Sequence, residues 1–191
     1  LIIVSVKPQQ IVEVLESIKS ALNPEKQILM STVTGVSIDE IEQLVGNKIG
    51  IIRIMPNTAI EVKESMTCIT CRNISVEQEN TILALFNKLG KGLIINEDLM
   101  GAATVIGACG IAFALRFMRA MSQGGIEIGF PADVSQFITA QTILGATRLI
   151  VESGNHPEKE IDKVTTPMGV TISGLNEMEH QGFSSAIIKG L

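Results

Sequence analysis

The chain has 191 residues, of which 46% are hydrophobic and 18% charged, with only 6 prolines. This composition is typical of a globular protein with one core or two small ones, and it excludes disordered, collagen-like and proline-rich chains. Acidic residues outnumber basic ones by 20 to 15, so the net charge is −5 and no overall positive field attracts nucleic acid. The absence of Trp and Tyr removes the usual stacking platforms for single-stranded nucleic acid.

The three cysteines are an odd number, which favours a reducing, cytoplasmic compartment over secretion. Cys68 and Cys71 have the C-x-x-C spacing, but they lie in the alternating run 65–71, which is typical of a strand. Positions three apart on a strand point to opposite faces, so we expect neither a metal site nor a redox pair there.

Neither apolar stretch of the chain has the pattern of a membrane or secretion segment. The opening run 1–6 is too short for a signal peptide and lacks a basic flank, and the stretch 99–115 falls short of a membrane span. We therefore expect no membrane partner. Because the chain opens without Met and within a strand pattern, we expect the sequence to begin partway into a longer protein.

The first half of the chain alternates strand and helix patterns. Ser37 and Glu40 have the spacing of a helix capping box, and Pro8 suits the first position of a helix. Strands are predicted at 1–6, 27–32, 48–55, 65–71 and 92–96, with helices at 8–22, 37–45 and 75–90. This alternation predicts a mostly parallel sheet covered by helices.

The strand signal disappears after residue 97, which predicts domains at 1–97 and 98–191. Helices are predicted at 98–123, stopped by Gly124-Gly125, and at 131–153, 157–164 and 167–180. The first of these helices is apolar on nearly every face, so every face must be covered. Fewer than a hundred residues cannot easily cover it alone, so we expect a partner subunit, in a homodimer or a higher homo-oligomer.

Polar residues follow the first three predicted strands. Lys7-Pro8, Thr32 to Gly35 and Asn57-Thr58 stand where a parallel sheet presents the carboxyl ends of its strands, the usual place for a ligand. A lysine beside a helix start suits a phosphate or a nucleotide edge. The alternative interpretation is a solvated lysine in a tight turn.

The stretch 164–171 carries a second candidate site. Thr166 suits a helix N-cap and Pro167 the first helical position, so the backbone N–H groups of Met168, Gly169 and Val170 are expected to point out of the helix start and bind an anion. Gly169 has no side chain to block that anion, and Thr171 adds a neutral hydroxyl. A well-capped structural helix is the alternative.

The two histidines are interpreted as structural. His156 precedes a helix and His180 lies in the last turn of one, where a cation interacts well with the helix dipole. No Ser-His-Asp arrangement or metal-ligand cluster stands out in the sequence.

The segment 162–172, continued to Gly182-Phe183, resembles the signature of pyrroline-5-carboxylate reductase, the last enzyme of proline synthesis. The segments 6–9, 53–58 and 141–146 fall in the order and at about the spacing of that family. The resemblance therefore extends over the whole chain.

The resemblance implies the C-terminal part of a Rossmann-type dinucleotide-binding domain, followed by an all-α dimerisation domain, and an α/β fold class. It also implies reduction of 1-pyrroline-5-carboxylate to L-proline with NADPH or NADH, with the glycine-rich phosphate loop upstream of Leu1 and no metal. Thr171 is implied as catalytic. The implied substrate-binding residues are Thr166, Pro167, Met168, Gly169 and Thr171, and the implied cofactor-binding residues are Val6, Lys7, Pro8, Thr32, Thr34, Asn57 and Thr58.

Two segments depart from the family pattern. Met168-Gly169 replaces Gly-Gly, and residues 108–113 read Ala-Cys-Gly-Ile-Ala-Phe in place of Gly-Ser-Gly-Pro-Ala-Tyr. These departures leave open a related imine or 3-hydroxy acid oxidoreductase, or a catalytically degenerate dimeric homologue. A 3-hydroxy acid enzyme usually needs a lysine in the helical domain, where Lys159 and Lys163 look exposed.

Overall fold

The computed structural model describes residues 1–46 and 48–191, which divide into two compact units, 1–112 and 113–191. The predicted domain boundary after residue 97 falls earlier than this division. Met100 is buried in a cluster with Met55 and Cys68 of the sheet, so the first turns after residue 97 belong to the first unit.

The first unit is built on a five-stranded sheet with the spatial order β1-β2-β3-β4-β5. The strands are β1 (Ile2–Val4), β2 (Ile28–Ser31), β3 (Gly50–Met55), β4 (Ser65–Arg72) and β5 (Gly90–Ile94). The pairs β1/β2, β2/β3 and β4/β5 are parallel, which confirms the mostly parallel sheet, whereas β3/β4 is antiparallel. The link 56–64 carries only the 3-10 helix η3 (Thr58–Val62), too short for the crossover that a parallel pair needs.

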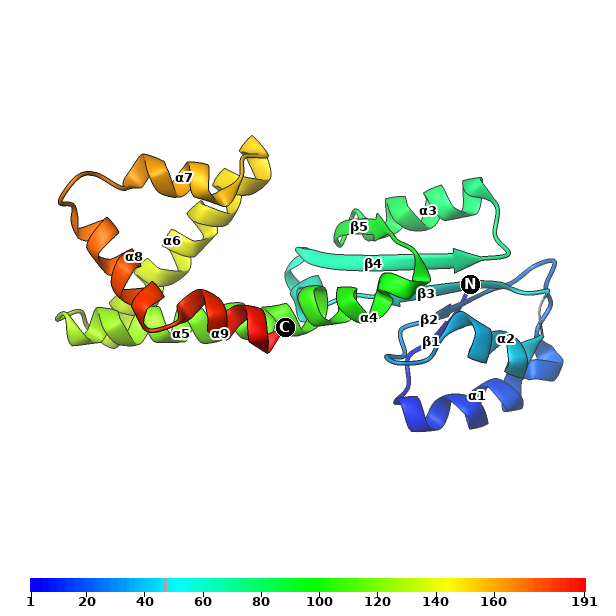
Figure 1. Ribbon diagram of the computed structural model, residues 1–191. Coiled ribbons are helices and arrows are strands. Elements are labelled where there is room, and N and C mark those ends of the chain that lie inside the picture. The colour runs from blue at the N-terminus through cyan, green and yellow to red at the C-terminus, as the bar shows by residue number, and fades with distance from the viewer. Residues whose placement is uncertain (47) are drawn as a thin grey trace. The chain divides into compact units, whose positions relative to one another are not determined.

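Helices cover both faces of this sheet (Figure 1). On one face, α1 (Ile11–Ile18) and α2 (Ile38–Val45) bury the apolar stripes predicted from their spacing, including Leu15 and Ile41. On the other face, α3 (Val76–Phe86) buries Ile82 and Phe86. The short 3-10 helices η1 (Pro8–Gln10) and η2 (Lys19–Ala21) extend α1, so the predicted helix 8–22 is confirmed in substance.

A long helical run begins at Glu97. It comprises η4 (Glu97–Leu99), α4 (Met100–Ala103), a π-helical segment η5 (Thr104–Cys109) and α5 (Gly110–Glu127).

The predicted stop at Gly124-Gly125 is wrong. A Cβ on Gly125 would lie 2.0 Å from the Ser135 Oγ of α6 (Ala132–Ser153), so this glycine permits close helix packing and does not end the helix. The Ser135 hydroxyl donates to the Ser122 carbonyl at 2.7 Å across the same crossing.

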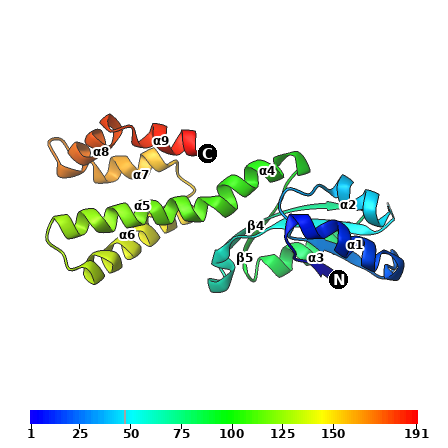
Figure 2. The same cartoon turned by 90° about the horizontal axis from the view of Figure 1, so that it is seen from below.

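The second unit is helical throughout, as predicted. The helices α7 (Pro157–Val164), α8 (Val170–His180) and α9 (Phe183–Gly190) follow α6. Figure 2 shows α6 turning back beneath α5, and Figure 1 shows the two helices diverging at an angle from the turn that joins them. Rings of Phe117 and Phe183, 5.8 Å apart, join α5 to α9. His156 caps α7, with its Nδ1 accepting from the Glu158 N–H, and His180 lies in the last turn of α8, as expected.

The run Glu97–Glu127 is 31 residues long and apolar enough to cross a membrane by length and composition. The expectation that the stretch falls short of a span considered residues 99–115 alone, whereas the helical run is continuous over Glu97–Glu127. Few of its side chains are buried within the chain, and large apolar residues of α5 and α6 such as Leu115, Phe137 and Val151 are exposed. The helical unit leaves apolar surface that this chain alone does not cover.

Candidate functional site

The carboxyl ends of β1, β2 and β3 come to one edge of the sheet, as the sequence predicts. The Thr32 N–H donates to the Val4 carbonyl at 3.0 Å, and the Thr32 hydroxyl donates to the Ser5 hydroxyl at 3.1 Å. These bonds tie the ends of β1 and β2 together. Thr34 and Gly35 follow on the surface, and the φ of +76° at Gly35 is a left-handed conformation that favours glycine.

The β1 end is shaped by a tight turn. The Gln10 N–H donates to the Lys7 carbonyl at 2.9 Å, and the Gln10 side chain accepts from the Lys7 N–H at 3.2 Å. Val6 packs on the core, and Pro8 begins η1. Lys7 is exposed, and no side chain within residues 1–46 and 48–191 pairs with its ammonium group, which leaves it available to an anion.

Both ends of the Asn57 side-chain amide make hydrogen bonds within the fold. Its Oδ1 accepts from the Ala59 N–H at 3.0 Å and so caps η3, whose first residue, Thr58, is exposed. Its Nδ2 donates to the Gly107 carbonyl at 2.8 Å. Its own N–H donates to the Ser65 hydroxyl. These bonds fix the π-helical segment against the sheet edge, and a contact between Asn57 and a cofactor stays a prediction.

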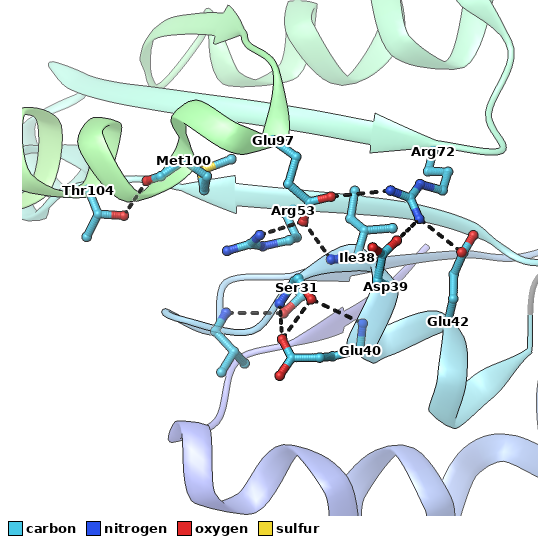
Figure 3. A network of polar contacts seen from close by, with 12 residues as sticks. Ser31, Ile38, Asp39, Glu40, Glu42, Arg53, Arg72, Glu97, Met100 and Thr104 are labelled. Carbon is cyan, nitrogen blue, oxygen red and sulfur yellow. Dashed lines mark hydrogen bonds and ion pairs between the residues drawn. The ribbon is translucent and has the colours of Figure 1, made fainter.

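A pocket of about 290 Å³ opens beside the β2 end. Its floor carries Arg53 of β3, a charged residue that is only 7% exposed and forms an ion pair with Glu97 at 2.6 Å (Figure 3). The pocket is lined by Thr34, Gly35, Ser37, Glu40, Arg53, Glu97, Met100, Gly101 and Thr104. Thr34 was expected near this site, whereas Arg53 and Glu97 were not, although an arginine within the apolar run 49–55 was a visible signal.

The predicted capping box forms one corner of this pocket. The Ser37 hydroxyl accepts from the Glu40 N–H at 3.2 Å, while the Glu40 carboxylate accepts from the Ser37 N–H at 2.7 Å. Hydrogen bonds from Ser37 hold the pKa of Glu40 below its usual value. This carboxylate is therefore ionised at neutral pH and serves to start α2.

The second candidate site is a turn that precedes α8, and its geometry differs from the expected one. The Gly169 N–H donates to the Thr166 carbonyl at 2.9 Å across Pro167-Met168. Gly169, not Thr166, is the N-cap, so the helix begins three residues later than expected, and the Gly169 N–H is not free for an anion. Among the residues that the structure describes, none accepts from the N–H groups of Val170, Thr171 and Ile172 at the helix start.

Gly169 is required by packing within this turn. A Cβ at this position would lie 2.6 Å from the Thr166 Oγ1 and 3.0 Å from its carbonyl oxygen. The space expected to admit an anion is thus filled by Thr166. Thr171, the second residue of α8, is exposed, and within the described chain its hydroxyl has no hydrogen-bond partner.

Met168 adopts a φ of +60°, in the left-handed region that favours glycine, and its side chain is fully exposed. The Met168 side chain therefore does not crowd the turn within the unit.

Replacing Met168 by Gly should stabilise the fold. The left-handed conformation costs an L-residue about 1–2 kcal/mol, which glycine avoids. Glycine also raises the conformational entropy of the unfolded chain, which lowers stability by about 0.4–1 kcal/mol. We expect a net gain of about 0.5–1 kcal/mol in the free energy of unfolding, measured by urea denaturation. Met168→Ala is the matched control, because it keeps the Cβ and hence the strain. Equal stability of the Gly and Ala variants would contradict this interpretation.

The two cysteines of the C-x-x-C spacing lie on opposite faces of β4, as predicted. Cys68 packs with Met55 and Met100, whereas Cys71 packs with the cluster around α3. Burial raises the pKa of both thiols, that of Cys71 to about 11, so neither is a thiolate at neutral pH.

The predicted residues thus form two groups. The strand-end residues come together in the first unit, and the residues of the turn before α8 come together in the second.

Comparison with known proteins assigns the family. Residues 97–191 match the family model described as pyrroline-5-carboxylate reductase dimerisation. The chain is 45% identical to pyrroline-5-carboxylate reductase 1 of Dictyostelium discoideum, over 100% of this chain and 37% of that protein. It is 41% identical to pyrroline-5-carboxylate reductase 2 of the same organism, over 100% of this chain and 69% of the relative.

A solved structure shows the same fold. The crystal structure of Plasmodium falciparum pyrroline carboxylate reductase with NADP bound superposes with a TM-score of 0.90 at 27% identity, over 98% of this chain and 75% of that one. The implied fold, a Rossmann-type domain followed by an all-α domain, is confirmed. On its sequence and its structure, the chain belongs to the pyrroline-5-carboxylate reductase family.

Proposed function

We propose that this protein reduces 1-pyrroline-5-carboxylate to L-proline with NADPH or NADH. The observation that carries the proposal is the turn 166–169, which presents Thr171 and free N–H groups at the start of α8 within the family-matched region 97–191. The reductases of Dictyostelium and the NADP-bound Plasmodium structure support the same activity.

The strand-end edge fits a dinucleotide. Three parallel strands end there, which is where α/β folds bind such ligands. A Cβ on Gly35 would stand in open space, so a ligand can approach the backbone closely. A nicotinamide cofactor supplies the hydride when bound. We assign its crevice to Val6, Lys7, Pro8, Thr32, Thr34, Asn57 and Thr58, with Asn57 acting through the wall that it supports.

The start of α8 supplies the groups that hold the substrate. The N–H groups of Val170 and Thr171 suit the substrate carboxylate, because the positive end of the helix dipole favours an anion. The Thr171 hydroxyl hydrogen-bonds the ring nitrogen as it becomes an amine. The turn Thr166–Gly169 sets the angle at which the helix presents these groups. Since an iminium carries its own proton, orientation is the main task of the protein.

Association of two chains completes the helical unit. The dimerisation model covers α5 and α6, whose large apolar side chains are exposed in the single chain. We assign this surface to a homodimer interface, which also accounts for the apolar run Glu97–Glu127 without a membrane. A cytoplasmic location and the absence of a nucleic-acid partner stay predictions from composition.

The rival 3-hydroxy acid activity gains no support from the lysines of the helical unit. Lys163 is half-exposed and pairs with Glu160 at 2.7 Å, and Lys159 donates to Asn155 at 3.1 Å. Both ammonium groups are engaged on the surface of α7.

The product identifies the reaction. The full-length protein, incubated with 1-pyrroline-5-carboxylate and NADPH or NADH, should form L-proline in a one-to-one ratio with the oxidised cofactor, measured by chiral chromatography. Cofactor oxidation without proline would assign the protein to a different imine or hydroxy acid.

A further inference from the structure

Glu97 occupies a position where three elements meet. Its Oε1 accepts from the Ile38 N–H of α2 at 2.6 Å and from Arg53 Nη1 of β3 at 2.6 Å. Its Oε2 lies 3.5 Å from Arg72 Nη2 of β4 (Figure 3). These partners are 59, 44 and 25 residues away from Glu97 in sequence. Its carboxylate therefore links α2, β3 and β4, which are far apart along the chain.

The contact with α2 complements the local cap. The capping box satisfies the N–H groups of Ser37 and Glu40, and it leaves the Ile38 N–H of the first turn without a local acceptor. The carboxylate of Glu97 fills that position and places a negative charge at the positive end of the helix. The start of α2 is therefore fixed by a residue from the far side of the pocket.

The same carboxylate joins the two walls of the pocket of about 290 Å³. One wall is the segment 34–40, which carries Thr34 and Gly35. The other is the helical run that begins at Glu97 and carries Met100, Gly101 and Thr104. The charged side chain of Arg53 lines the same pocket and is only 9% exposed. Its ion-pair partner among the described residues is Glu97.

We propose that Glu97 is a positioning residue for the dinucleotide: its carboxylate holds the segment 34–40 against the helical run and neutralises Arg53, so that Thr34 and Gly35 keep the geometry that the cofactor needs. This inference rests on the proposed function, because it assigns the neighbouring crevice to NADPH or NADH. It acts through the pocket walls and requires no contact between Glu97 and the cofactor.

Glu97→Ala removes all three contacts and leaves Arg53 without its ion-pair partner. We expect the dissociation constant for NADPH or NADH, measured by fluorescence titration of the full-length protein, to rise about tenfold. The KM for the dinucleotide should rise in parallel, while the KM for 1-pyrroline-5-carboxylate stays within about twofold, because the substrate groups on α8 belong to the other unit. Glu97→Gln keeps an acceptor for the Ile38 N–H, so its effect should be smaller.

Glu42→Ala is the matched control. Glu42 accepts from Arg72 at 3.0 Å and from Asn73 Nδ2 at 3.0 Å, so its removal breaks contacts of the same network at a residue that does not line the pocket. If Glu97 only stabilised the fold, the two alanine variants would both lose folded protein and keep the dinucleotide affinity of the parent. An unchanged dissociation constant in folded Glu97→Ala, or in Glu97→Gln if the alanine variant does not fold, would overturn the proposal.

Binding measured without substrate separates this inference from the proposed function. Failure of proline formation with normal dinucleotide binding would remove the proposed reaction, and the Glu97 effect on binding would still be measurable. Normal proline formation with equal dinucleotide affinity in the Glu97 and Glu42 variants would remove only the role of Glu97.

Discussion

Replacing Thr171 by Val should lower kcat/KM for 1-pyrroline-5-carboxylate tenfold to hundredfold. Valine keeps the shape of threonine and removes its hydroxyl, which is exposed at the start of α8 and has no partner within the described chain. A neutral hydrogen bond contributes about 0.5–1.5 kcal/mol net, and more in a site that excludes water. Steady-state kinetics of the full-length protein measure the effect.

Two controls isolate the Thr171 hydroxyl. Thr171→Ser keeps the oxygen and should retain most of the activity. Ser173→Ala removes a nearby hydroxyl that donates to the Gly169 carbonyl at 3.2 Å, and it should leave kcat/KM within about threefold. Dinucleotide affinity should be unchanged in all three variants. If Thr171→Val has the kcat/KM of the parent, Thr171 only packs its methyl group and takes no part in the reaction.

Phe137→Glu should convert a dimer into monomers at micromolar concentration. Phe137 is 72% exposed on α6, within the surface that we assign to the dimer interface. A buried charge without a partner costs on the order of 3–5 kcal/mol, and a twofold interface repeats that cost in each subunit. Light scattering and sedimentation measure the mass.

Gln136→Glu is the control for this substitution, because it adds the same charge at a neighbouring position that is already polar and exposed. It should leave the dimer intact. A parent protein that is a folded monomer at micromolar concentration would contradict the assignment of α5 and α6 to a dimer interface.

Local patterns in the sequence were sufficient to predict most of the first unit. The apolar spacing of α1 and α2 and the Ser37/Glu40 capping box all appear in the structure, because each depends on residues within a few positions of one another. The antiparallel pairing of β4 could be argued only from the short link 56–64 once both strands were placed.

Two predictions in the helical unit were wrong. Gly124-Gly125 has the local pattern of a helix end, yet the helix continues because Gly125 packs against Ser135 on another helix. Thr166 has the local pattern of a cap, yet the turn closed by the Gly169 N–H moves the helix start to Val170. The first error comes from a contact with another helix, and the second from a local turn that the cap pattern does not distinguish from a helix start.

The residues of the polar site that follow strands were predicted, whereas the bonds between distant residues were not. Thr34 and Lys7 could be placed because they follow strands whose direction the fold determines. The pairing of Arg53 with Glu97 spans 44 residues, and the bond between Asn57 and Gly107 spans 50, so no local pattern indicates either of them.

The most direct test of the proposed activity compares substrates at fixed dinucleotide concentration. The rate at which the full-length protein oxidises NADPH or NADH should be measured with 1-pyrroline-5-carboxylate, with a cyclic imine that lacks the carboxylate, and with a 3-oxo acid, the oxidised form of a 3-hydroxy acid. We expect turnover with 1-pyrroline-5-carboxylate to exceed that with either alternative at least a hundredfold, because the carboxylate and the ring nitrogen are the two groups that the start of α8 holds. Equal or faster turnover of either alternative, or none with 1-pyrroline-5-carboxylate, would contradict the proposed reaction.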